Sequence, residues 1–73
     1  MADTKVCSEI AGTVWKILVK VGDTIEADVP LVLLESMKME IPVVSSDPGV
    51  VTEIFFAEGE PVAQGDVVLL IRC

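Results

Sequence analysis

The chain has 73 residues, 52% of them apolar, and a formal net charge of −7. This length predicts a single small domain spanning residues 1–73. The negative charge argues against nucleic acid as a partner, because a phosphate-binding protein needs clustered Lys and Arg, and no apolar stretch reaches the ~18 residues needed to cross a membrane.

The start of the chain and the two cysteines indicate a compartment. The first five residues, Met-Ala-Asp-Thr-Lys, lack the charged and apolar regions of a signal peptide. We therefore expect a cytoplasmic protein in which Cys7 and Cys73 remain free thiols. Cys7 is expected to pack as a small apolar residue. Two cysteines in a chain without histidine make a poor zinc site.

Gly and Pro interrupt the chain every few residues, and short runs rich in β-branched residues lie between them. This pattern is typical of an all-β sandwich or barrel with tight turns. The expected strands cover residues 5–9, 13–19, a short segment near Ile25, 31–36, 39–44, 50–57, a short segment near Val62, and 67–72.

A short pattern occurs twice, at about residues 7–36 and 44–73, with a constant offset of 37 residues. It predicts a flattened eight-stranded β-barrel or sandwich, made of two four-stranded halves related by a quasi-two-fold axis. Each half contains a three-residue step between apolar positions, which implies a β-bulge within Trp15-Lys16 and within Thr52-Glu53. After the bulge, the matched residues Leu18 and Phe55 should point outward.

The junction of the two halves carries the run Ser36-Met37-Lys38-Met39, which reads as a two-residue hairpin turn with Met37 and Lys38 at its centre. Such turns favour type I′ geometry with positive φ at both central residues, and Met-Lys is a poor local choice for it. Departures from local rules tend to mark functional sites. The repeat also places this turn and the chain termini at opposite ends of the molecule. We expect Lys38 and at least one of the two methionines to be exposed.

The chemistry open to Lys38 is limited. A catalytic lysine needs a pKa lowered by burial or by a neighbouring cation, whereas Lys38 should be exposed with Glu35 and Glu40 nearby. The chain has no histidine and no tyrosine, so no general base is apparent beyond scattered carboxylates. Covalent acylation of the amine by a separate enzyme fits better. A five-carbon acyl chain on the lysine would reach on the order of 14 Å.

The run Glu35-Ser36-Met37-Lys38-Met39-Glu40 resembles the biotinylation motif of biotin carboxyl carrier domains, and the flanking glycines and apolar positions match that family over most of the chain. The resemblance implies a flattened eight-stranded barrel with Lys38 on an exposed hairpin. It implies covalent biotin on Lys38, with Glu35, Met37 and Met39 as recognition or turn residues. It also implies three partners, namely a biotin protein ligase and the biotin carboxylase and carboxyltransferase components of a carboxylase.

Size and layout are similar to the small stand-alone biotin/lipoyl attachment proteins of the same family. A lipoyl carrier, with lipoate on Lys38 added by a lipoyl ligase and used by an acyl-transfer or dehydrogenase complex, is the alternative, and dual modification stays open. An unmodified interaction module is a second alternative, although it has no reason to keep Met-Lys-Met. In each case we expect a non-enzymatic protein, without a metal site, that is a monomer when isolated.

Overall fold

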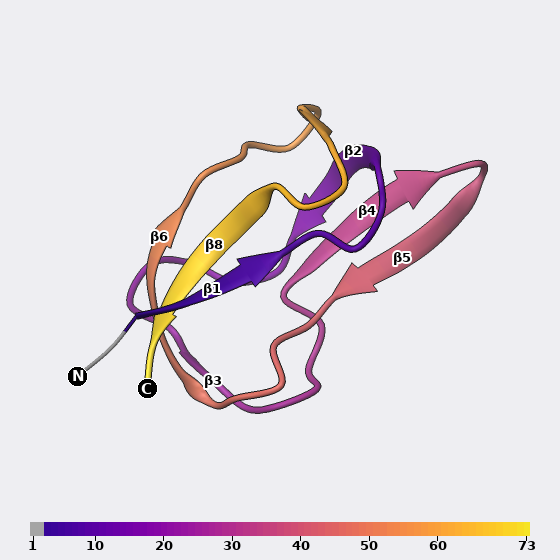
Figure 1. The fold of residues 1–73 in the computed structure, drawn as a ribbon. Helices are drawn as coiled ribbons and strands as arrows, with labels where there is room; N and C mark the ends of the chain where they lie inside the picture. The colour runs from indigo at the N-terminus through magenta and orange to yellow at the C-terminus, as the bar shows by residue number, and fades with distance from the viewer. Residues whose placement is uncertain (1–2) are drawn as a thin grey trace.

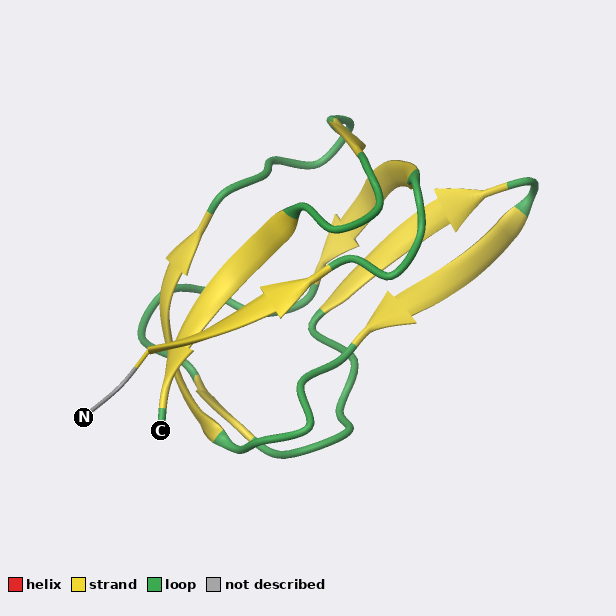
Figure 2. Ribbon diagram, in the orientation of Figure 1, coloured by secondary structure: helices red, strands yellow, loops and turns green. Residues whose placement is uncertain are grey.

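The computed structural model describes residues 3–73, which form eight strands and no helix (Figure 2). No helix long and apolar enough to span a membrane occurs in that part of the chain. The strands are β1 (Asp3–Cys7), β2 (Gly12–Ile17), β3 (Thr24–Ile25), β4 (Val32–Ser36), β5 (Met39–Val43), β6 (Gly49–Ile54), β7 (Pro61–Val62) and β8 (Val67–Arg72). All eight expected strands are present. The first lies two residues earlier than expected, and β2 and β6 end earlier.

The strands form two four-stranded sheets, in the orders β1-β8-β6-β3 and β5-β4-β2-β7. The repeat relates β1, β8, β6 and β3 of the first sheet to β5, β4, β2 and β7 of the second, in that order. The two sheets are therefore equivalent under the repeat. The sandwich prediction is confirmed, and the described strands do not close into a barrel. Each sheet combines strands from both halves of the chain, so the sequence halves do not correspond to separate sheets.

Both predicted bulges are present. In the pairing of β2 with β4 the register shifts between Val14 and Lys16, and in the pairing of β6 with β8 it shifts between Val51 and Glu53. An extra residue in one strand bends it and increases its twist. These bends curve each sheet around the shared core.

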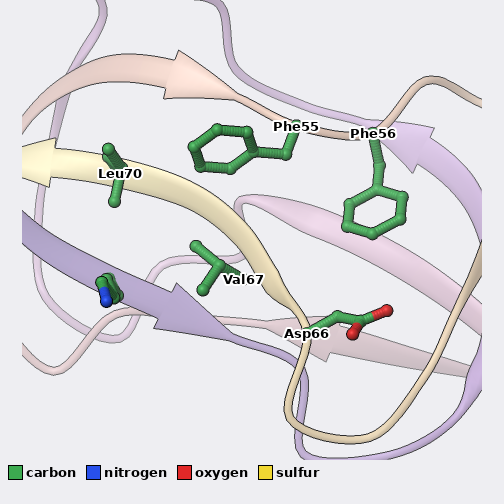
Figure 3. Close-up of a pocket in the computed structure, with 6 residues that line it drawn as sticks. Phe55, Phe56, Asp66, Val67 and Leu70 are labelled. Carbon is green, nitrogen blue, oxygen red and sulfur yellow. The ribbon is translucent and has the colours of Figure 1, made fainter.

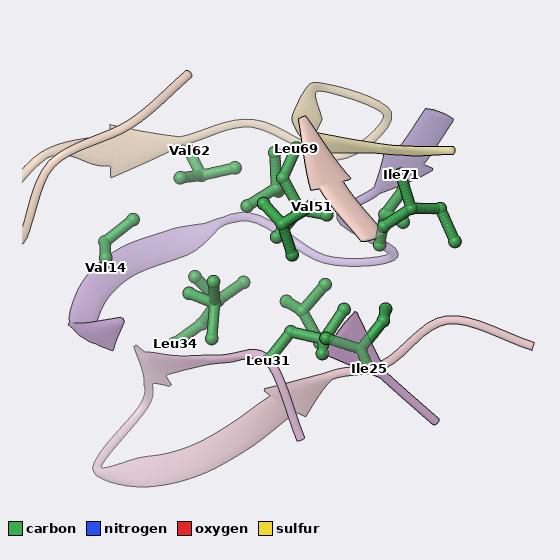
Figure 4. Close-up of a cluster of buried hydrophobic side chains, with 12 residues drawn as sticks. Val14, Ile25, Leu31, Leu34, Val51, Val62, Leu69 and Ile71 are labelled. Carbon is green, nitrogen blue, oxygen red and sulfur yellow. The ribbon is translucent and has the colours of Figure 1, made fainter. Parts of the chain in front are cut away.

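The core lies between the two sheets and consists of twelve buried aliphatic side chains (Figure 4). Burying such a side chain fully contributes about 1.5–3 kcal/mol, so this cluster holds the sheets together. Its members are Val6, Val14, Ile25, Leu31, Val32, Leu34, Val43, Val51, Val62, Val68, Leu69 and Ile71.

Two buried serines at matched positions of the repeat fix the turns, and the sequence pattern did not reveal them. Ser8 and Ser45 are 2% and 4% exposed. The hydroxyl of each donates a hydrogen bond to the carbonyl two residues ahead, of Ile10 and Asp47 respectively. The hydroxyls therefore satisfy backbone groups that would otherwise be left unpaired near the core.

The molecule is elongated, with principal extents of 36 × 18 × 18 Å. The C-terminus and the start of β1 lie at one end, and the tip of the β4–β5 hairpin projects at the opposite end (Figure 1). The predicted end-to-end arrangement is thereby confirmed. The prediction that Cys7 packs inside is wrong: Val6 occupies the core position of β1, and Cys7, which follows a register shift, is exposed.

Candidate functional site

The candidate site is the tip of the β4–β5 hairpin. The two strands pair in unbroken register up to Ser36 and Met39, which leaves Met37 and Lys38 as a two-residue turn. Their φ angles are 51° and 66°, which is the positive-φ pair that type I′ geometry requires. The left-handed conformation costs an ordinary L-residue roughly 1–2 kcal/mol, and neither side chain can recover that cost by packing, because both are exposed.

The tip presents its side chains to solvent. Met37 is 91% exposed and Met39 is 62% exposed, and Lys38 between them is also exposed. Among residues 3–73 the salt bridge formed is that between Arg72 and Asp3, so the Lys38 ammonium has no ion-pair partner in the described chain. The result is a primary amine at the end of a narrow hairpin, open to approach by another molecule.

Two carboxylates face each other across the hairpin, close to its tip. Glu35 of β4 lies directly opposite Glu40 of β5, and like charges in this arrangement are destabilising. The repeat supplies an internal comparison, since the matched positions are Arg72 and Asp3. These are also directly opposite each other, and the Arg72 Nε lies 3.1 Å from the Asp3 Oδ1. The fold accepts a complementary pair at this position, so packing does not require the acidic pair beside Lys38.

Gly12 supports the end of β4 that leads into the turn. A Cβ on Gly12 would lie 2.8 Å from the Glu35 carbonyl oxygen and 3.5 Å from the Ser36 Cβ. The backbone of β2 can therefore approach β4 closely only because this residue is glycine. At the opposite end of the molecule, a Cβ on the matched residue Gly49 would lie 2.6 Å from the Arg72 carbonyl oxygen.

These features suit covalent attachment through Lys38. Forming an amide requires one accessible amine and no further protein ligands. The Lys38 amine at the tip is exposed and forms no ion pair in the described chain. Among the residues that the structure describes, no group of three His, Cys, Asp or Glu residues is placed to hold a metal ion. Glu35, Met37, Lys38 and Met39, which the sequence singled out, are brought together here, whereas the contribution of Gly12 was not foreseen.

Comparison with known proteins gives consistent results. The family model described as "Biotin-requiring enzyme", for biotin/lipoyl domains, matches residues 4–71. The biotin/lipoyl attachment protein of Bacillus subtilis is 49% identical over 61 residues, which are 84% of this chain and 84% of that protein. The biotin carboxyl carrier protein of Streptococcus mutans is 43% identical over 60 residues, covering 82% of this chain and 46% of that protein.

A solved structure has the same fold. The crystal structure of the Kluyveromyces lactis urea carboxylase superposes with a TM-score of 0.92 and 33% sequence identity. The match covers 99% of this chain but only 6% of the urea carboxylase chain. The similarity therefore concerns one small part of that enzyme.

Proposed function

The chain belongs to the family of biotin/lipoyl carrier domains, and on that basis we propose that Lys38 carries covalent biotin and that the protein is a carboxyl carrier for a biotin-dependent carboxylase. The observation that carries this proposal is the exposed Lys38 at a left-handed turn between two exposed methionines. The names of relatives that align over most of this chain, a biotin/lipoyl attachment protein and a biotin carboxyl carrier protein, support the choice of cofactor.

The attachment reaction needs little from the carrier itself. The Lys38 Nζ, as the free amine, would attack the activated carboxyl group of biotin in the active site of a biotin protein ligase. A C–N bond forms, the activating group leaves and a proton is lost, so the lysine becomes a neutral amide. Once attached, biotin supplies a ureido nitrogen that carries a carboxyl group from one active site to another.

The residues around Lys38 would serve recognition and positioning. Met37 and Met39 offer exposed apolar surface that a ligase can read, and Glu35 offers a carboxylate on the strand that leads into the turn. The strained turn and the close packing of Gly12 hold the amine clear of the body. Presenting a residue on a rigid element in this way lowers the cost of ordering it for reaction.

The proposal assigns the catalytic steps to other proteins. The carrier would be a substrate of the ligase, and then of the biotin carboxylase and carboxyltransferase components, and not an enzyme itself. We place it in the cytoplasm, the reducing compartment that suits two free, exposed thiols. We expect the isolated carrier to be a monomer.

The proposal is tested by expressing the wild-type chain and Lys38→Arg with a biotin protein ligase and biotin, and measuring intact mass. The wild type should gain the mass of one biotinyl group, and Lys38→Arg should gain none while keeping the thermal midpoint of the wild type. Arginine keeps the positive charge and cannot be acylated, so it isolates the amine. A biotin adduct on Lys38→Arg would contradict the assignment.

Lipoate is the second candidate, and one observation favours keeping it: a relative that matches 84% of this chain is named for both cofactors. The same expression with a lipoyl ligase and lipoate distinguishes the two. We expect biotin to be attached faster, because Lys38 lies between two methionines. Modification by lipoate alone would assign the protein to an acyl-transfer or dehydrogenase complex instead.

A further inference from the structure

The chain has three methionines, and two of them, Met37 and Met39, flank Lys38. Met37 is 91% exposed and Met39 is 62% exposed. The proposed function uses only the apolar surface of these side chains and leaves their sulfur atoms without a role. Oxidation converts the flexible apolar side chain of an exposed methionine into a polar sulfoxide. The tip therefore places the amine between two side chains whose polarity an oxidant can change.

Away from the tip, other exposed apolar side chains do not offer this chemistry. Leu18 and Phe55 are 49% and 47% exposed, in agreement with the outward direction expected for both, and both side chains are hydrocarbon. Phe55 also lines a hollow over the β1–β8 pair, and none of the described residues that line this hollow contains sulfur (Figure 3). The exposed thiols of Cys7 and Cys73 are oxidisable, but neither cysteine belongs to the β4–β5 hairpin.

Oxidation at the tip should change the surface without changing the fold. Neither methionine belongs to the buried core, which consists of Val, Leu and Ile side chains. Met39 pairs with Ser36 through the strand ladder, which joins backbone groups that a sulfoxide leaves intact. The apolar area that a ligase can read would be lost, because a sulfoxide is polar.

Leucine would offer similar volume and apolar area at both positions. Methionine differs from leucine in its flexibility and in its oxidisable sulfur. Flexibility alone would suit a recognition surface, but it gives no reason for the tip to respond to an oxidant. The response of biotinylation to peroxide therefore distinguishes the two properties.

We propose that Met37 and Met39 are sites of oxidation by hydrogen peroxide, and that their sulfoxides slow the acylation of Lys38 by the biotin protein ligase. This inference rests on the proposed function. In each oxidation, one oxygen atom passes from the peroxide to the methionine Sδ: the O–O bond breaks, an S=O bond forms and water leaves. The thioether loses two electrons and the peroxide gains them. A methionine sulfoxide reductase reverses the change with two electrons from thiols and releases the oxygen as water.

The experiment uses the full chain with Cys7→Ser and Cys73→Ser, because both thiols are exposed and would also consume peroxide. The chain is treated with hydrogen peroxide, separated from it, and given to a biotin protein ligase with biotin. Tandem mass spectrometry shows which residues have gained oxygen. Oxidation of both tip methionines should lower kcat/KM for biotinylation by about tenfold, the size expected when part of a methionine side chain no longer makes apolar contact. The thermal midpoint should not change.

Met37→Leu combined with Met39→Leu, in the same cysteine-free chain, is the matched control, since leucine keeps the apolar volume and cannot form a sulfoxide. Its rate of biotinylation should be close to that of the untreated chain and should not respond to peroxide. If this variant is a poor substrate, methionine sulfoxide reductases for both sulfoxide epimers keep the test valid, because they should restore the rate of the oxidised chain.

Equal rates before and after complete oxidation of both tip methionines would overturn the proposal. A loss of rate that comes with a marked fall in the thermal midpoint would also overturn it, because oxidation would then act through the fold. So would an equal loss in the double leucine variant, since another residue would then be responsible. Failure of the untreated chain to accept biotin would instead contradict the proposed function.

Discussion

At the tip of the β4–β5 hairpin, Met37 and Lys38 occupy backbone that favours asparagine and glycine. Asp28 is the other non-glycine residue with positive φ in residues 3–73, at 63°. It lies in the loop before β4, and its match in the repeat is Gly65, which also has positive φ. The left-handed residue at position 28 thus matches a glycine that is also left-handed, whereas both residues at the tip are ordinary L-residues in a turn that favours glycine or asparagine.

Replacing Met37 distinguishes the backbone strain at the turn from recognition of the Met37 side chain by the ligase. Met37→Asn should raise the free energy of unfolding by about 0.5–1 kcal/mol, since asparagine tolerates the left-handed region and little packing is lost from a side chain that is 91% exposed. It should also slow biotinylation if the ligase reads Met37. Urea unfolding and initial rates of modification measure the two effects.

Asp28→Gly is the matched control for Met37→Asn. It should leave the biotinylation rate unchanged, because residue 28 lies in a loop away from the tip. Loss of stability in Met37→Asn would argue that the methionine side chain supports the turn through contacts, contrary to its exposure.

Gly12 offers a second residue-scale test. Gly12→Ala should lower the free energy of unfolding by about 1–3 kcal/mol, because the new Cβ would overlap the Glu35 carbonyl oxygen. Gly49→Ala should cost a similar amount through its clash with Arg72. Only the Gly12 variant displaces the end of β4 that leads into the turn, so only it should slow biotinylation under folding conditions. Equal rates for the two variants would show that the position of this end of β4 does not matter.

At the scale of the elements, the residue pair next to the hairpin tip has a charge arrangement that its counterpart in the repeat avoids. Glu40→Arg converts the Glu35–Glu40 pair into the type of pair formed by Arg72 and Asp3. Unfolding in urea at low salt should show a gain of about 0.2–1 kcal/mol. The gain should shrink at high ionic strength, where exposed charges are screened. A loss of stability at low salt would mean that Glu40 makes a favourable contact that its exposure does not suggest.

The strands and turns were largely predictable from the sequence, because the pattern of apolar residues and glycines that indicates them occurs in both halves of the repeat. The steps from Val14 to Ile17 and from Val51 to Ile54 located both bulges, and the hairpin turn followed from its position between two strand patterns. The exchange of strands between the halves was not predictable. A constant offset of 37 residues is compatible with two arrangements: each half of the chain could form its own sheet, or both halves could contribute strands to each sheet. Only pairing between distant residues, such as Thr24 with Val50, distinguishes the two arrangements.

Side-chain direction at the strand ends was also beyond the sequence. Cys7 lies at a register shift in β1, where alternation alone does not say which face a residue takes. The roles of Ser8 and Gly12 depend on contacts with backbone far along the chain or with turns whose shape is set by the fold. Lys38, by contrast, could be proposed as the attachment residue from the sequence, because the residues next to it in the sequence are also next to it in space.

At the scale of the whole molecule, modification should change charge without changing stability. Amide formation removes the single positive charge of Lys38, so the formal net charge goes from −7 to −8. The biotinylated form should bind an anion-exchange column more tightly, while its thermal midpoint stays within error of the unmodified form, because Lys38 makes no ion pair in the described chain. A marked rise in the midpoint would indicate that the attached group packs against the body.

The most direct test of the account is to map the attachment site on the wild-type protein by tandem mass spectrometry after biotinylation. The chain offers four lysines, Lys5, Lys16, Lys20 and Lys38, and all of them except Lys38 lie on the body of the molecule. The account predicts biotin on the peptide that contains Lys38 and on no other. Biotin on any of the other three lysines, at a comparable level, would contradict it.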